Sequence, residues 1–241
     1  SMKILITGGA NGIGKATVTK LLEIGYDVKV IDNDEESLRD LPDKVGKHPG
    51  DVSEDGVIEM IEKLDFDILI NCAGFQEQGS VEDMPLETFH KHIDTNYYGT
   101  VRTVKAGLPQ LKEKDGRIIN VSSIAGKSTM PFLGAYSASK HAVEGFSDAL
   151  RMEMSEFDVD VVLIEPGPIE TGFNRRAIEA LEKYIPESEY SDDYERRMNT
   201  DGFNGVGAEK AAEKVVKAVE AKNPKSRYTV TWQAWFISKF K

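Results

Sequence analysis

Residues 7–14 read TGGANGIG and decide how the rest of the chain folds. They follow the apolar run KILIT at residues 3–7 and precede apolar residues at helical spacing, so a strand, a glycine-rich turn and a helix are expected in that order. We expect a positive φ at Gly8, a backbone at Gly12 that a pyrophosphate can approach, and close packing of the helix on the sheet at Gly14. The N–H groups at the helix N-terminus would then face the phosphates. The alternative is a turn that needs glycine for its own geometry and binds nothing.

The succession of strand and helix continues along the chain. Further strands are expected at residues 28–32, 67–70, 117–121, 159–164 and 228–231. Helices are expected at residues 53–64 with Ser53 as N-cap, and at 85–112, 136–156 and 208–222. This alternation predicts an α/β fold: a doubly wound parallel sheet of the Rossmann type, in three α/β/α layers.

The length of 241 residues suits one domain of this kind, over residues 2–241. Residues 171–207 are the weakly patterned part, and they include the acidic run ESEYSDDYE at 187–195. A long segment of weak periodicity inside a compact domain is often functional, so we expect a substrate lid at 171–207. A solvated surface excursion is the alternative.

The composition excludes several classes of function. The net charge of −11 repels phosphate backbones, so no nucleic-acid partner is expected. The single cysteine, Cys72, excludes an intrachain disulfide and a multi-cysteine zinc site; it suits the cytoplasm and is expected to be a packing residue. His90 and His92 are two residues apart and would point to different sides of a helix, so no metal site is expected. The sequence contains no run of about 18 apolar residues, so no membrane span is expected.

An acidic residue follows the second strand at the place where a dinucleotide site needs one. The carboxylate of Asp32 can accept hydrogen bonds from both adenosine ribose hydroxyls and would repel a 2′-phosphate. Neither the two residues after it nor Asn11 in the glycine turn is basic, so we expect NAD rather than NADP. Asp51 and Val52 are expected beside the adenine. A plain turn residue is the alternative for Asp32, and a plain loop acid for Asp51.

Three polar residues further along can carry proton chemistry. Tyr136 and Lys140 are one helical turn apart and share a face, so the ammonium would favour the phenolate and lower the tyrosine pKa from about 10. Such a phenol can move a proton to or from an alcohol or ketone oxygen. Ser123 follows a strand and can hydrogen-bond the same oxygen. Taken singly, the tyrosine could be a packing residue and the lysine a solvated one.

These residues belong to an ordered set that resembles the short-chain dehydrogenase/reductase family over nearly the whole chain. The set comprises TGxxxGxG at residues 7–14, NxAG at 71–74, Asn96, Ser123, YxxxK at 136–140 and PG at 166–167. The separations of Ser123 and Asn96 from Tyr136 are typical of the family.

The resemblance implies a role for each residue. Tyr136 is implied as the general acid/base, with Lys140 binding the nicotinamide ribose and lowering the tyrosine pKa. Ser123 is implied to orient the substrate carbonyl and Asn96 to hold a water in a proton relay; Asn96 could instead satisfy backbone groups in a helix kink. Cofactor contacts are expected at Gly8, Asn11, Gly12, Ile13, Gly14, Asp32, Asp51, Val52, Asn71, Ala73, Gly74, Tyr136, Lys140, Pro166, Gly167, Ile169 and Thr171.

Substrate choice is expected to depend on residues 75–79, residues 125–132 and the lid. The apolar residues Met130, Phe132, Leu133 and Phe173 favour a hydrophobic secondary alcohol or ketone, although core packing is the alternative for each. The C-terminal sequence resembles the hydroxysteroid and retinol dehydrogenase branch of the family, so the resemblance implies a steroid-, retinoid- or acyl-like substrate. Near the C-terminus Trp232, Trp235, Phe236 and Phe240 recur at helical spacing and could meet a membrane surface, a partner subunit or the core. The resemblance also implies a homodimer or homotetramer.

The sequence therefore predicts an NAD(H)-dependent oxidoreductase that transfers a hydride between nicotinamide and a secondary alcohol or ketone. The alternative is an NAD-binding redox sensor or scaffold that has the same fold and no turnover.

Overall fold

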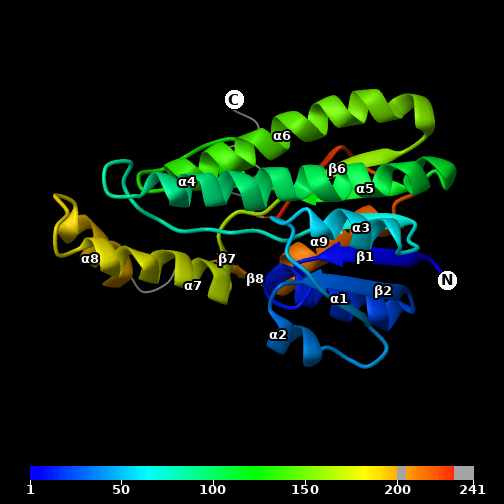
Figure 1. The fold of residues 1–241 in the computed structure, drawn as a ribbon, viewed down its shortest axis with the longest axis horizontal. Helices are drawn as coiled ribbons and strands as arrows, with labels where there is room; N and C mark the ends of the chain where they lie inside the picture. The colour runs from blue at the N-terminus through cyan, green and yellow to red at the C-terminus, as the bar shows by residue number, and fades with distance from the viewer. Residues whose placement is uncertain (200–204, 231–241) are drawn as a thin grey trace.

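The architecture is a parallel sheet between two layers of helices, in a computed structural model that describes residues 1–199 and 205–230 (Figure 1). The strands of the sheet are β1 (Lys3–Thr7), β2 (Asp27–Asp32), β3 (Gly46–Pro49), β4 (Ile68–Asn71), β5 (Arg117–Val121), β6 (Asp160–Glu165) and β9 (Arg227–Thr229). Their spatial order is β3-β2-β1-β4-β5-β6-β9, and every neighbouring pair is parallel. The direction of winding reverses between β1 and β4, which is where open α/β sheets bind ligands.

Both faces of the sheet are covered. Ile4 and Ile6 of β1 pack in one buried cluster with residues of α1 (Gly12–Ile24) and α9 (Ala208–Glu220). Leu5, which points to the opposite face, packs in a second cluster with residues of α3 (Gly56–Glu62), α5 (Gly99–Glu113) and α6 (Gly134–Met154). Burying each such side chain stabilises the fold by about 1.5–3 kcal/mol. The predicted doubly wound, three-layer α/β fold is therefore confirmed.

The weakly patterned segment after β6 contains helices that the sequence analysis did not predict. It holds α7 (Gly172–Glu179), α8 (Ser191–Asn199) and β8 (Val206–Gly207), and β8 pairs with β7 (Ile169–Glu170), which lies just before the segment. In Figure 1, α7 and α8 (yellow) lie beyond the end of the sheet toward which β1 runs. Tyr194 of α8 belongs to the acidic run 187–195 and is fully buried. Its ring packs on Phe132, and its hydroxyl donates to Asp83 Oδ2. That anchor explains why a segment with weak periodicity is helical here.

Several elements differ from the predictions. The helix expected at 85–112 is divided into α4 (Leu86–His92), a π-helical turn (Ile93–Tyr98) and α5. Ser53 does not cap a helix: its N–H and hydroxyl both donate to Asp51 Oδ1, and α3 begins at Gly56. The short helix α2 (Glu35–Arg39) was not predicted, and it begins after Asp34, whose side chain accepts from the Ser37 N–H. The last expected strand is seen as β9, and Thr231 lies outside the described residues.

Within residues 1–199 and 205–230, no helix combines the length and the apolar character that crossing a bilayer requires.

The glycine turn generates a stability prediction. A Cβ at Gly14 would lie 2.0 Å from the Gly8 carbonyl oxygen, so the backbone must shift to accept one. We expect Gly14→Ala to lower the free energy of unfolding by about 1–3 kcal/mol, measured as the urea midpoint at unchanged slope.

Gly145→Ala is the matched control, because Gly145 is an exposed helical glycine in α6 and a Cβ there would meet no atom within 4 Å. It should raise the free energy of unfolding by up to about 1 kcal/mol. Equal effects of the two substitutions would contradict the close approach at Gly14.

Candidate active site

A cavity of about 990 Å³ runs along the carboxyl ends of the strands, from the glycine turn to α7. Most of the predicted site residues line it, although they come from seven different segments of the chain. The lining includes Gly8, Asn11, Gly12, Ile13, Gly14, Asp32, Asp51, Val52, Ala73, Gly74, Ser123, Tyr136, Lys140, Pro166, Gly167, Ile169 and Thr171. Asn71 and Asn96 do not line it.

The glycine turn has the geometry that a pyrophosphate requires. Gly8 has φ +68°, and a Cβ there would lie 2.5 Å from Ala73 Cα in the turn after β4. Gly12 has φ +52° and opens α1, whose first turn contains no acidic residue. The N-terminus of α1 therefore presents N–H groups and the positive end of its dipole to the cavity without a competing carboxylate. The residues present fit a dinucleotide.

Asp32 lies at the end of β2 in a frame of polar groups. Its carboxylate accepts hydrogen bonds from the Ala10 N–H (2.9 Å to Oδ2) and the Asp34 N–H (3.0 Å to Oδ1). Asn11 donates to Asp34, and Asn33 donates to Asp51. No lysine or arginine is among the described residues that line this end of the cavity.

Asn71 has a different place from the one expected. Its side chain is buried, accepts from the Thr103 hydroxyl and donates to Asn120 Oδ1, and Asn120 in turn donates to Ser147. The chain of hydrogen bonds joins β4 and β5 to helices α5 and α6. The expected cofactor contact at Asn71 stays a prediction, and it would involve the backbone, because the strand's alternation turns the side chain toward the helices and away from the cavity.

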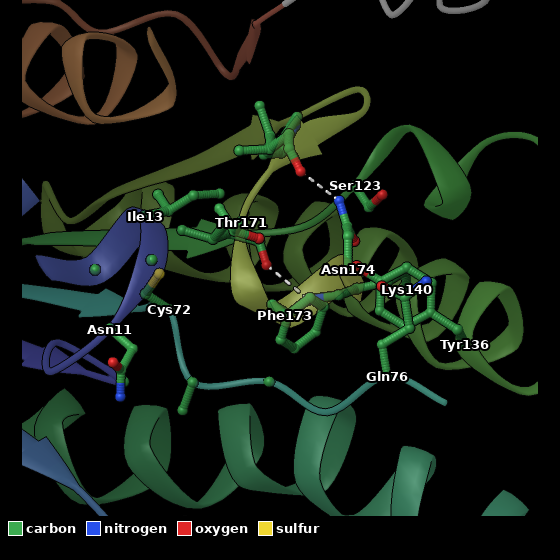
Figure 2. Close-up of a pocket in the computed structure, with 18 of the residues that line it drawn as sticks. Asn11, Ile13, Cys72, Gln76, Ser123, Tyr136, Lys140, Thr171, Phe173 and Asn174 are labelled. Atoms are coloured by element: carbon green, nitrogen blue, oxygen red, sulfur yellow. Dashed lines mark hydrogen bonds between the residues drawn. The ribbon is translucent and has the colours of Figure 1, made fainter. Parts of the chain in front are cut away.

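The side chains expected to carry proton chemistry lie together on one wall of the cavity (Figure 2). Ser123 follows β5, its hydroxyl accepts from the Ala125 N–H, and it lies close enough to Tyr136 to act on the pKa of the phenol. Tyr136 is in the first turn of α6, and Lys140 follows one turn later. Lys140 Nζ donates to the Val121 carbonyl at 2.9 Å and lies 5.8 Å from the Tyr136 ring centroid.

The pKa values of this group reflect burial first. Burial raises the pKa of Tyr136 to about 12, and the Ser123 hydroxyl acts in the opposite direction. Burial lowers the pKa of Lys140 to about 8, against the influence of Cys72 and Glu144. The sequence predicted that Lys140 would lower the tyrosine pKa, and the pKa is raised instead. The cost of burying a phenolate outweighs the attraction of the Lys140 ammonium, which donates to the Val121 carbonyl.

Asn96 is buried in the π-helical turn with both ends of its amide engaged. Oδ1 accepts from the Phe75 N–H, and Nδ2 donates to the Phe75 carbonyl and to Ser139 Oγ. A Cβ on Gly74 would lie 3.5 Å from Asn96 Oδ1 and 4.0 Å from Lys140 Nζ, so these side chains surround the turn after β4. The side chain of Asn96 thus holds the backbone of Phe75 in the segment after β4, and its expected role in a proton relay stays a prediction.

The cavity wall also contains polar residues that were not singled out individually from the sequence. Gln76 and Gln78 belong to the expected segment 75–79, and Asn174, Arg176 and Arg197 belong to the expected lid, whereas Thr95 lies outside every predicted segment. Met130, Leu133 and Phe173 line the far end of the cavity as expected, with the Phe173 ring 6.4 Å from that of Tyr136. Phe132 does not line it: it has φ +70° and packs on Tyr190 and Tyr194. Tertiary packing of α7 and α8 brings these residues together, and no local pattern signals it.

Cys72 lies in the cavity wall, and burial raises the pKa of its thiol to about 11. A protonated thiol is a poor nucleophile, which agrees with a packing role. In the described part of the chain, no three His, Cys, Asp or Glu side chains are grouped to hold a metal ion.

Comparison with known proteins agrees with this geometry. Residues 2–182 match the profile of the short chain dehydrogenase family. The chain is 37% identical to the "Probable short-chain type dehydrogenase/reductase VdlC" of Helicobacter pylori, with 94% of this chain and 87% of that protein covered. It is 36% identical to a 3-ketodihydrosphingosine reductase of Bacteroides thetaiotaomicron, with the same shares covered.

A solved short chain dehydrogenase from Burkholderia cenocepacia, in complex with NADP, has the same fold with a TM-score of 0.83. The two are 24% identical, and the match covers 99% of this chain and 92% of that one. The profile match over most of the chain and the two curated relatives establish that this protein is an oxidoreductase of the short-chain dehydrogenase/reductase family.

Proposed function

We propose that this protein transfers a hydride between NAD(H) and a secondary alcohol or ketone, with Tyr136 as the general acid/base. The observation that carries the proposal is the grouping of Ser123, Tyr136 and Lys140 on one wall of a cavity whose other end fits a dinucleotide. Bound nicotinamide supplies the hydride; the chain supplies position, polarity and a proton.

The proton route begins at Tyr136. With a pKa near 12 its hydroxyl is protonated at neutral pH, so it can donate a proton to a carbonyl oxygen that becomes an alkoxide. The Ser123 hydroxyl, which lies beside the phenol, can hold the same oxygen. Lys140 lies beside the phenol and the cavity, so its ammonium favours negative charge on the tyrosine oxygen once the proton has left.

Several implied roles belong to this proposal. Residues 166–171 lie in the cavity wall, where Ile169 and Thr171 can contact the nicotinamide side of a cofactor. For Asn96, a water held for a proton relay would have to use its backbone, because its side-chain amide is engaged with Phe75 and Ser139.

The choice of NAD over NADP rests on Asp32. Its carboxylate is held by two backbone N–H groups at the dinucleotide end of the cavity, where a 2′-phosphate would meet a negative charge and no lysine or arginine among the described residues that line this end. The Burkholderia structure contains NADP, but at 24% identity its likeness concerns the fold. NAD preference is therefore proposed from this chain's own residues.

The substrate is proposed to be apolar around its reacting carbon. Met130, Leu133 and Phe173 line the far end of the cavity, and residues 171–207 would form the lid over it, within a single domain. The protein is proposed to act on a small-molecule ketone or alcohol, to form a homo-oligomer and to reside in the cytoplasm. No nucleic-acid partner is proposed. The C-terminal aromatic residues Trp232, Trp235, Phe236 and Phe240 lie outside the described residues.

Tyr136→Phe tests the mechanism. Loss of the hydroxyl should lower kcat by about 10²–10⁴-fold, because general acid catalysis is removed while the ring remains. The measurement is NADH oxidation with a panel of apolar ketones, with NADH binding followed separately by fluorescence.

Tyr98→Phe is the control, since Tyr98 is 51% exposed and should tolerate the change. A wild-type rate for Tyr136→Phe would contradict the assigned role. Binding of NADH without turnover of any ketone by the unaltered protein would favour the sensor alternative.

Cofactor affinity tests the role of Asp32. We expect NADH to bind about tenfold or more tightly than NADPH, since one unfavourable charge contact is worth on the order of 1.4 kcal/mol. Asp32→Asn keeps an oxygen for the Ala10 N–H but removes the charge. It should therefore improve NADPH binding and bring the affinities for NADH and NADPH closer together.

Glu62→Gln on α3 makes the same change of net charge at an exposed position away from the cavity, and it should leave the ratio unchanged. Tighter binding of NADPH by the unaltered protein would overturn the NAD assignment.

A further inference from the structure

Residues 75–80 form a wall of the cavity without regular secondary structure, with Gln76 and Gln78 facing the far end. Hydrogen bonds to distant parts of the chain hold this segment in place. The amides of Phe75, Glu77, Gln78, Gly79 and Ser80 donate to Asn96 Oδ1, His92 Nε2, Ala177 O, Phe132 O and Tyr194 Oη respectively. Among these five acceptors, the imidazole is the one that titrates near neutral pH.

His92 is the last residue of α4 and is fully buried. Its Nδ1 lies 2.7 Å from the Thr88 carbonyl oxygen, which can only accept, so Nδ1 carries the proton. Nε2 is then a lone-pair acceptor, and it receives the Glu77 N–H at 3.0 Å. The neutral ring with this tautomer satisfies both contacts.

The ring also packs against both the wall segment and the proposed acid. Its centroid lies 4.7 Å from that of Phe75 and 6.5 Å from that of Tyr136. His92 is one turn before Asn96. The end of α4 and the π-helical turn therefore accept hydrogen bonds from successive parts of residues 75–80.

We infer that His92 is a positioning residue, whose neutral imidazole holds residues 75–80 in the conformation that shapes the substrate end of the cavity, and that its protonation releases them. The effect on substrate binding rests on the proposed function, whereas the effect of His92 on residues 75–80 does not. A proton on Nε2 would set N–H against N–H at Glu77, leaving a donor without an acceptor in a buried place.

The surrounding charges determine the direction of the pH effect. The charged groups that act on the ring are the Glu77 carboxylate, which favours protonation, and Lys91, which opposes it. Glu77 already contacts Lys183 and the Tyr184 hydroxyl, and Lys91 lies over the Phe75 ring. Burial outweighs these influences and lowers the pKa of His92 below its ordinary 6.5. A conformation in which the ring reaches water therefore binds the proton more readily, so release is favoured as pH falls below about 6.5.

Amide hydrogen exchange of the whole protein tests the inference without turnover. Between pH 7.5 and pH 5, after correction for the intrinsic chemical rate, protection of residues 75–80 should fall by about tenfold or more. Peptides covering β1 should keep their protection and so report that the fold is intact.

His92→Gln is the decisive variant, because an uncharged carboxamide oxygen can accept the Glu77 N–H at every pH. It should keep the segment protected at pH 5. His90→Gln is the matched control: His90 is exposed on the same helix, so this variant should lose protection as the unaltered protein does. His92→Ala should show low protection at both pH values. Unchanged protection in the unaltered protein, or equal loss in His92→Gln, would overturn the inference, whether or not His92→Ala folds.

Kinetics then connect the segment to catalysis. For a ketone from the panel, KM should rise several-fold on acidification in the unaltered protein and stay level in His92→Gln. If no ketone is reduced, the proposed function fails while the exchange result still decides the role of His92.

Discussion

The close approach of two backbone turns is the constraint on which the site depends. Gly8, after β1, lies so near the turn after β4 that a side chain would overlap Ala73. Because β1 and β4 are neighbours at the point where the winding of the sheet reverses, this contact places the N-terminus of α1 and the turn at Gly74 in the same cavity. Asn96, Lys140 and Phe173 then surround Gly74. The dinucleotide end and the proton-transfer end are thereby joined through backbone geometry.

A second property of the site is the cost of burying its polar groups. Tyr136 and Lys140 are both buried. Burial raises the pKa of Tyr136 and lowers the pKa of Lys140, so it favours the neutral form of each group. A phenol that stays protonated is suited to giving a proton to a carbonyl oxygen, while a neighbouring ammonium favours the negative charge that then develops on the phenol oxygen. The hydrogen bond from Lys140 to Val121 and the place of Ser123 beside the phenol fix the geometry in which these changes occur.

Sequence reasoning succeeded where the chemistry is local. The glycine turn, Asp32 and the spacing of Tyr136 and Lys140 are set by residues close together in the chain, and the structure brings them to one cavity. It could not specify which face or partner a side chain would choose: Asn71 turns to the helices, Asn96 holds the Phe75 backbone, and Phe132 packs on Tyr194. Such choices are made by tertiary contacts. The helices α7 and α8 were missed for the same reason, since a single buried tyrosine organises α8 within an otherwise polar run.

The central claim is that the cavity joins a nicotinamide to a ketone for hydride transfer. It is tested most directly by incubating the protein with NADH that carries deuterium on C4, on each face in turn, and a ketone from the panel. The account predicts product alcohol that carries deuterium on the former carbonyl carbon, from one face of the nicotinamide. Bound NADH and no deuterium in any alcohol would contradict it.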